Sequence, residues 1–420
     1  MLQRRYSIMS HEKNTYFHYA WCIVIGGFII MALLHSMIQT CFSLFLPAVT
    51  DYMHISNTAF SGCSSIVAIA SMLVAPKMGK YMQNSHQFKS IMTICIIGTG
   101  LSYASYGFAT SIIHMYISGF CLGIFSCGAT ILPITIILVR WFHKNTGLAI
   151  GITLSGSGIG GSIISPFLTD FISTYGWRRS FILFGILMIV IEVPVAYFMM
   201  IPNPEDIGYK PYGMTSDRAS ASPLKNLPFQ DLKKHTFFYI YLIGIFCICV
   251  AGYGSLGYLS ASLTENYGPS LAYAIIPFFL FLLTPAKIFL GWLYDHIRTE
   301  ICTIYVSFTF ATAFILLQIS NNESLMWIMA IFFSLGISAG TVIPSFITYD
   351  FFDSDDFGSL FGFVYAVCMG AMAVGNPLLA AIYDLTNSYD LAWSACASFC
   401  ILSGICIVYI AEKKQRHTML

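Results

Sequence analysis

Residues 277–298 read PFFLFLLTPAKIFLGWLYDHIR and place one positive charge, Lys287, inside a nearly unbroken apolar segment. The apolar residues begin at Leu271 and continue to Asp295, which is long enough to cross a membrane. A lysine near the middle of a bilayer costs about 2.5–3.5 kcal/mol, so it is tolerated where it faces a bundle interior, water or an anion. The stretch therefore predicts a transmembrane helix with a functional site at Lys287. The alternative is a lysine whose long side chain reaches the membrane interface.

The composition of the whole chain agrees with this prediction. Of its 420 residues, 57% are hydrophobic and only 9% are charged, against about 25% charged residues in soluble domains. No basic tract suits a nucleic acid, and the 13 cysteines lie mostly in apolar segments without the Cys/His spacing of a metal site. The chain is therefore predicted to be an all-α protein whose partner is the lipid bilayer, with no cofactor and no nucleic acid. The first apolar run is longer than a signal-peptide core, so we expect it to remain as the first helix.

At about 20 apolar residues per membrane crossing, the sequence predicts twelve helices. Their expected ranges are 19–46, 58–82, 89–109, 112–140, 147–173, 179–201, 236–263, 271–294, 300–319, 324–349, 358–384 and 391–411. The segment between the sixth and seventh helices is rich in Pro, Ser, Asp and Lys and lacks helical periodicity. We therefore expect a six-helix half at 1–201, a linker loop at 202–235 and a second six-helix half at 236–420.

The basic residues predict the orientation of these helices. Lysine and arginine gather at both termini, in the linker and in the loops on the same side, whereas Arg178 and Arg179 lie on the opposite side. By the positive-inside rule, both termini and the linker are cytoplasmic. We expect a multi-pass protein of the plasma membrane in which a single chain is sufficient, and the oligomeric state is left open.

The two predicted halves carry signs of an internal duplication. Pro133, Gly151 and Pro166 recur at one constant offset in the second half, as Pro344, Gly362 and Pro377. Two parallel six-helix halves, related by an axis along the membrane normal, are the organisation of the major facilitator fold. We therefore expect this twelve-helix fold, with the substrate site between the halves near the membrane midplane.

The loop after the eighth helix carries Gly291, Asp295 and Arg298, and resembles the gating motif of the major facilitator superfamily. The glycine permits close helix approach, and the two charged residues can bond helix ends or charges that separate when a gate opens. The corresponding first-half loop keeps Gly79 but has Gln83 in place of the acid. We expect the first-half latch to be the weaker one.

Residues 140–161, RWFHKNTGLAIGITLSGSGIGG, resemble the helix 4–5 junction of the monocarboxylate transporter and oxalate/formate antiporter families. The stretches 203–213 and 376–389 resemble the same families, so the resemblance covers nearly the whole chain. Small residues at helical spacing let backbones pack closely. The stretch therefore identifies the family, and we interpret its glycines as helix-packing residues. The residues that match the shared pattern are Trp141, Phe142, Gly147, Leu148, Ala149, Gly151, Gly156, Ser157 and Gly160.

The resemblance implies a role for Lys287. In these families an arginine four residues before the glycine of the helix 8 loop binds the substrate carboxylate, and Lys287 has that spacing to Gly291. Lysine pairs with a carboxylate as a point charge and orients it less strictly than arginine. Oxalate antiporters carry a second basic residue in helix 11, whereas residues 357–381 contain none. We therefore expect a small organic anion and favour a monocarboxylate, with antiport of a dicarboxylate as an alternative.

The resemblance also bears on energy coupling. Proton-coupled monocarboxylate transporters have a lysine in helix 1 and an aspartate in helix 8, and these positions fall at Gln39 and Leu283. We therefore expect exchange or facilitated flux rather than symport by that lysine–aspartate pair. His35, one turn before Gln39, and Glu192 are the remaining intramembrane candidates for proton coupling. For each of them, a hydrogen-bonded packing role is the alternative.

Two further polar residues, Tyr253 and Asn376, are candidate substrate-binding groups in the predicted cavity, beside Lys287, Gln39 and His35. Asn376 could instead bond backbone groups near Pro377. Two other classes of function are alternatives to a carrier. A membrane sensor built on a transporter fold would bind a small carboxylate without turnover. An enzyme is not expected, because no nucleophile–base pair or metal cluster stands out.

Overall fold

The structure is a computed structural model that describes residues 18–83, 85–214, 229–319, 322–352 and 356–417. Within these ranges, twelve helices are long and apolar enough to cross a membrane. We number them spans 1 to 12 in chain order. Six spans precede the linker and six follow it, which confirms the predicted all-α architecture.

The first six spans contain several breaks. Span 1 consists of five pieces, namely α1 (Ala20–Ile30), the π-helical turn η1 (Met31–His35), α2 (Ser36–Gln39), the 3₁₀ turn η2 (Phe42–Phe45) and α3 (Leu46–Met53). Spans 2 and 3 are α4 (Asn57–Gln83) and α5 (Ser85–Ser105), the latter extended by η3 (Tyr106–Phe108). Span 4 is divided into α6 (Ile112–Cys127) and α7 (Ile131–Trp141). Spans 5 and 6 are α8 (Thr146–Tyr175) and α9 (Trp177–Phe198).

The second six spans follow two short helices of the linker, η4 (Pro204–Ile207) and α10 (Phe229–Leu232). Span 7 is α11 (Thr236–Leu256), which is followed by the short helix α12 (Leu259–Tyr267). Spans 8 to 12 are α13 (Pro269–His296), α14 (Thr299–Ile319), α15 (Glu323–Phe352), α16 (Phe357–Thr386) and α17 (Asp390–His417).

The predicted helix 236–263 is wrong at its C-terminal end, because α11 ends at Leu256. The amide of Tyr258 donates to the Ser255 carbonyl at 3.1 Å, which is the short spacing of a tight last turn. Glycine at position 257 weakens the helix at this point. Span 1 likewise runs beyond the predicted residue 46 and ends at Met53, before His54 in the left-handed conformation. Hydropathy misses both features because it reports how apolar a segment is and not where the backbone leaves the helix.

The linker is more ordered near its start than its composition predicts. The backbone of Tyr212 exchanges hydrogen bonds with the junction between α7 and α8. Its amide donates to the Trp141 carbonyl at 2.8 Å, and its carbonyl accepts from the His143 amide at 3.0 Å. Residues 202–214 therefore lie against the first half, while 215–228 lie outside the described residues.

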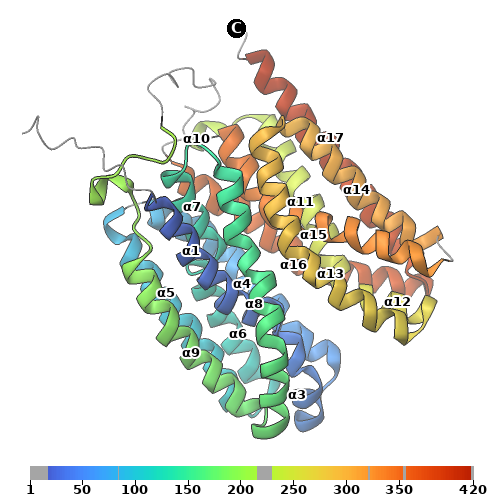
Figure 1. Ribbon diagram of the computed structural model, residues 1–420. Helices are drawn as coiled ribbons and strands as arrows, with labels where there is room; N and C mark the ends of the chain where they lie inside the picture. The colour runs from blue at the N-terminus through green and yellow to red at the C-terminus, as the bar shows by residue number, and fades with distance from the viewer. Residues whose placement is uncertain (1–17, 84, 215–228, 320–321, 353–355, 418–420) are drawn as a thin grey trace, which may run out of the picture.

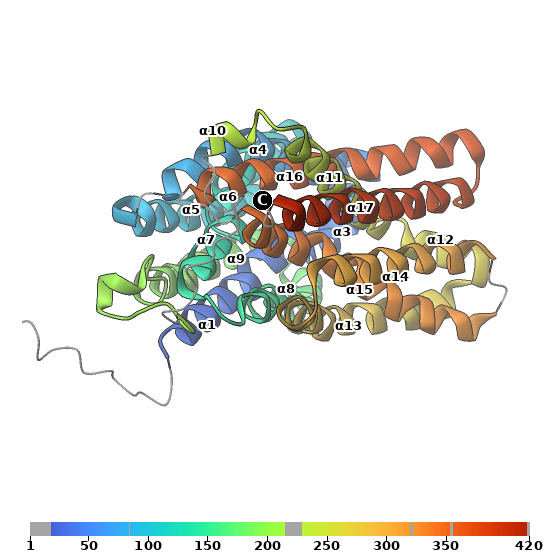
Figure 2. The ribbon, with the colours of Figure 1, turned by 90° about the horizontal axis from the view of Figure 1, so that it is seen from above.

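The halves meet along two pairs of helices, α4 with α16 and α8 with α13 (Figures 1 and 2). Glycines bring these helices together, because a Cβ at Gly79 would overlap the Gly358 carbonyl and a Cβ at Gly291 would overlap the Gly147 carbonyl. The four glycines lie at the end of the bundle that carries η4 and α10, which we call the linker end. Toward α3 and α12 the two groups of helices diverge in Figure 1. The halves are therefore closed against each other at the linker end.

The same glycines reveal the duplication in three dimensions. Gly151, matched in the sequence with Gly362, lies against Gly291, and Gly362 lies against Gly79. The repeated glycines of spans 5 and 11 thus contact equivalent glycines of spans 8 and 2. This reciprocal packing agrees with the predicted repeat, and the residue boundaries of the two halves stay a prediction.

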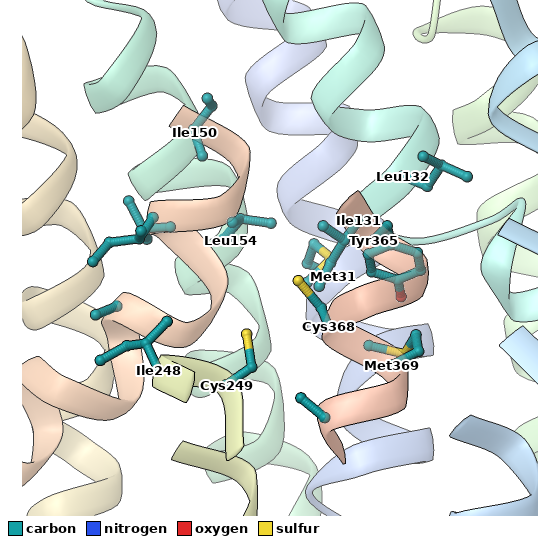
Figure 3. Packing of buried hydrophobic residues seen from close by; sticks show 14 of the residues in the cluster. Met31, Ile131, Leu132, Ile150, Leu154, Ile248, Cys249, Tyr365, Cys368 and Met369 are labelled. Carbon is teal, nitrogen blue, oxygen red and sulfur yellow. The ribbon is translucent and has the colours of Figure 1, made fainter. Parts of the chain in front are cut away.

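Between the two helix pairs, the middle of the molecule is filled by apolar side chains. Figure 3 shows Met31 and Ile131 of the first half beside Tyr365 and Cys368 of α16. All four side chains are buried. A charged or polar side chain buried among these apolar residues needs a hydrogen-bond partner within the protein. The residues that form such bonds identify the candidate site.

Candidate functional site

Lys287 lies on α13 at the seam with α8, and its side chain is 6% exposed. Its ammonium donates to the hydroxyl of Ser157 at 2.7 Å and to the carbonyl of Leu154 at 3.2 Å. Both acceptors belong to α8, so the bonds cross from the second half to the first. The ammonium thus points into the protein and not toward a membrane interface, as the alternative interpretation required.

The electrostatic environment of Lys287 is unusual. Both of its hydrogen-bond acceptors are neutral, and among the described residues no carboxylate lies within ion-pair distance of its ammonium. A buried charge without a counter-charge is costly, because neutral acceptors replace only part of the lost hydration. The site is therefore chemically suited to an anion that could approach the ammonium.

Glycines in α8 explain why its backbone comes so close to Lys287. A Cβ at Gly151 would lie 2.5 Å from the Lys287 carbonyl, and a Cβ at Gly158 would lie 2.6 Å from the Thr284 hydroxyl. The small residues thus bring α8 and α13 together, as the packing interpretation predicts. Ser157, in the same run, was interpreted only as part of the family pattern. A hydroxyl group on the packing face of an intramembrane helix is the signal that could have found it.

His35 and Gln39 are on span 1, one turn apart. Lys287 is close enough to His35 to interact with it electrostatically. The amide nitrogen of Gln39 lies 3.6 Å from the sulfur of Met372 on α16. Gln39 and Met372 also line a cavity of about 10 Å³, together with Ile38, Phe42, Ser64, Val67 and Leu122. The structure therefore places both candidates between the halves, with His35 on the Lys287 side and Gln39 facing α16.

Tyr253 and Asn376 come together in a different place. With its amide oriented to satisfy both groups, the Asn376 nitrogen donates to the carbonyls of Gly254 at 3.1 Å and Tyr253 at 3.2 Å. These bonds join α16 to α11 within the second half. Asn376 thus satisfies backbone carbonyls, which was the alternative to a substrate contact.

Glu192 is fully buried on α9. One carboxyl oxygen, Oε1, accepts the backbone N–H of Leu34 at 2.8 Å. The other oxygen, Oε2, has no hydrogen-bond partner among the described residues. Glu192 therefore contacts span 1 from within the first half, and its connection with Lys287 is indirect.

The predicted gating residues lie at the linker end. The carboxylate of Asp295 accepts the backbone N–H groups of Gly147 at 2.8 Å and Leu148 at 2.7 Å, and so caps the N-terminus of α8 across the interface. Arg298 behaves differently, because its Nε lies 3.6 Å from Glu300 of its own half and its side chain is 64% exposed. Asp295 thus bonds a helix end as predicted, whereas the described contact of Arg298 does not cross to the first half.

Gln83 occupies the equivalent place in the first half. Its side-chain oxygen accepts the backbone N–H of Gly358 at 2.7 Å and caps the N-terminus of α16. Each half therefore caps a helix of the other. The Asp295 cap uses two hydrogen bonds and a carboxylate, whereas the Gln83 cap uses a neutral amide, which is a weaker acceptor at a helix N-terminus.

The comparisons with known proteins agree with this fold. The sequence family described as Major Facilitator Superfamily matches residues 28–351. The chain therefore belongs to the major facilitator superfamily, and it is a multi-pass membrane transporter with a small-molecule substrate. Its family and relatives are transporters and not enzymes.

Its curated relatives include transporters of one named group. Human Monocarboxylate transporter 2 is 23% identical to the chain, over 95% of the chain and 88% of the relative. Human Monocarboxylate transporter 12 is 25% identical, over 96% of the chain and 82% of the relative. The resemblance to monocarboxylate transporters predicted from the motifs is thus confirmed.

Solved structures confirm the fold. The fucose:proton symporter FucP of E. coli has a TM-score of 0.69 at 12% identity, covering 93% of the chain and 98% of that structure. The human organic anion transporter MFSD10 has a TM-score of 0.68 at 13% identity, covering 93% of the chain and 99% of that structure. At such identities the likeness concerns the fold alone.

Proposed function

We propose that the protein carries a small organic anion across the membrane, with the carboxylate of the substrate pairing with Lys287. The observation that carries this proposal is the buried ammonium with two neutral acceptors and no carboxylate partner among the described residues. An arriving carboxylate gains an ion pair in a low-dielectric site. It also supplies the counter-charge that Ser157 and Leu154 do not.

A monocarboxylate matches the charge of this site. Lys287 is the one basic residue of α13 before the helix end. The helix α16, which packs against α4 at the other contact between the halves, has no lysine or arginine. A dicarboxylate would place a second negative charge among apolar side chains without a partner. The named relatives of the chain are monocarboxylate transporters, which supports the same choice.

The distribution of basic residues assigns the linker end to the cytoplasm, together with both termini, in a plasma-membrane protein. With this orientation, the halves are closed on the cytoplasmic side. Asp295, seated on the N-terminus of α8, then serves as a latch of the inner gate, and Gly291 permits the close approach. Transport follows when residues 1–201 and 236–420 rock about the substrate site. A single chain contains the complete path.

The intramembrane groups favour exchange or facilitated flux. Gln39 and Leu283 stand where the related proton symporters carry their lysine and aspartate, so that pair is missing. His35 and Glu192 are the candidates that could carry a proton instead. In proteoliposomes loaded with the transported anion, we expect exchange without a pH gradient. Uphill uptake that follows a pH gradient and is lost in His35→Gln would contradict this assignment.

The proposal is tested with purified protein and a panel of acetate, pyruvate and succinate. A ligand of the folded state raises the melting temperature with its concentration. We expect stabilisation and uptake with a monocarboxylate for the wild type, loss of both in Lys287→Gln, and partial retention in Lys287→Arg. Unchanged uptake in a folded Lys287→Gln protein would refute the anion site. Stabilisation without any uptake would favour the alternative of a membrane sensor.

A further inference from the structure

Glu192 is the most isolated acidic group in the described part of the bundle. Its carboxyl is fully buried, with one backbone hydrogen bond at Oε1 and none at Oε2. An ionised carboxylate in this position would lack both hydration and a counter-charge, which makes the charged form unfavourable. A neutral acid leaves only a single hydroxyl unpaired, which is less costly than a buried charge. The geometry therefore favours a proton on Oε2.

The hydrogen bond of Glu192 falls on an irregular part of span 1. Leu34, whose N–H it accepts, belongs to the π-helical turn Met31–His35. Such turns contain one extra residue relative to an α-helix and are frequent at functional sites. At the other edge of the turn, the Ser36 hydroxyl donates to the Met31 carbonyl at 3.2 Å and to the Ser157 carbonyl at 2.8 Å. Side chains thus bond the turn on both sides.

The π turn decides which side chains of span 1 face the second half. An α-helix advances by 3.6 residues per turn, so loss of one extra residue would rotate the following segment by about 100°. His35 ends the turn, and Gln39 lies one helical turn later, where its amide contacts Met372 of α16 across the interface. A regular helix would turn them away from these positions.

The turn is also connected with the lysine site. Gly156 and Gly160 of α8 let span 1 pack closely against this helix. A Cβ at Gly156 would overlap the Phe28 carbonyl, and a Cβ at Gly160 would overlap the Ala32 carbonyl. Between these glycines lies Ser157, whose carbonyl accepts from Ser36 and whose hydroxyl accepts from Lys287. A short series of contacts therefore runs from Glu192 through span 1 and α8 to the ammonium.

We propose that Glu192 is a positioning residue that stays a neutral acid and, by accepting the Leu34 N–H, maintains the π turn that sets the register of His35 and Gln39. It acts through span 1 and does not touch the substrate. The expected effect on transport rests on the proposed function, whereas the expected effect on the π turn does not. It assigns Glu192 a role other than carrying protons.

The test compares two substitutions at one position. Glu192→Gln keeps the acceptor oxygen and the size of the neutral acid, so we expect wild-type behaviour. Glu192→Leu fills the space without an acceptor, so we expect faster hydrogen exchange at the backbone of residues 31–36 and a KM for pyruvate raised by about tenfold or more. Ile191→Leu, at a neighbouring side chain that is 42% exposed, is the matched control.

Three results would overturn the proposal. The first is unchanged hydrogen exchange at residues 31–36 in Glu192→Leu, and the second is faster exchange in Glu192→Gln. The third is loss in Glu192→Gln of uphill uptake driven by a pH gradient, which would make Glu192 a proton carrier. If Glu192→Leu does not fold, the infrared carboxylic-acid band of the wild type, absent from Glu192→Gln, decides whether the acid is neutral. Hydrogen exchange needs no substrate, so failure of pyruvate uptake in the wild type would count only against the proposed function.

Discussion

Asp295→Asn tests whether the carboxylate on the N-terminus of α8 latches the inner gate. In the structure both carboxylate oxygens accept backbone N–H groups of the other half, at 2.8 and 2.7 Å. An asparagine keeps one acceptor oxygen and turns an NH₂ group toward the second N–H. The substitution therefore removes one charge-assisted hydrogen bond and the attraction between the charge and the helix end.

The magnitude follows from these two losses. A hydrogen bond to a charged group contributes about 1.5–3 kcal/mol, and a charge at a helix N-terminus contributes about 0.3–1 kcal/mol. Asp295 is half-buried, so solvent screens part of this energy. We expect the state that is closed at the linker end to lose about 2 kcal/mol, which changes the ratio of the two states by about 30-fold.

Exchange in proteoliposomes and ligand-induced stabilisation measure rate and affinity separately. We expect Asp295→Asn to slow exchange much more than it weakens binding, because the residue lies at the linker end and away from Lys287. Arg298→Gln is the control, since its side chain is 64% exposed and an exposed ion pair such as that with Glu300 contributes only about 0–1 kcal/mol. An equal loss of rate and affinity, or an equally large effect of Arg298→Gln, would refute the latch.

Two further predictions concern the same interface. Gly291→Ala should prevent closure at the linker end and abolish exchange, because the new Cβ would overlap the Gly147 carbonyl. Gly340→Ala, whose Cβ would meet open space, should leave exchange unchanged. Measurable exchange at the wild-type rate in a folded Gly291→Ala protein would contradict this packing. Gln83→Ala should slow exchange less than Asp295→Asn, since it removes one hydrogen bond from a neutral acceptor. A larger effect of Gln83→Ala in the same assay would show that the first-half cap dominates the gate.

The number and class of the helices could be read from the sequence because the signal is local. Each span is a run of apolar residues of membrane length, and the basic residues that predict its orientation lie beside it. The duplication could also be predicted, because each half keeps a glycine, Gly151 or Gly362, at the equivalent position where two helix backbones approach closely. The ends of span 1 and span 7 were missed, because apolar composition does not distinguish a continuous helix from two short ones.

The candidate site divides in the same way. Lys287 was found because a charge in an apolar run is conspicuous in any context. Asp295 was found because its spacing to Gly291 and Arg298 resembles the gating motif. Ser157 was not, since serine in a run of small residues has the same appearance whether or not a lysine lies opposite. The role of Arg298 was predicted from the motif, and the structure instead places it beside Glu300 in its own half.

The amino-acid sequence by itself thus determined that this protein lies in a membrane. It also determined the helices, the repeat and the buried positive charge, because each depends on neighbouring residues. Only the tertiary structure decided the partners. Lys287 meets Ser157 across 130 positions of sequence, Leu34 meets Glu192 across 158, and Gln83 meets Gly358 across 275. Inside a membrane, a polar group must find its partner within the protein, and the fold determines which residue is within reach.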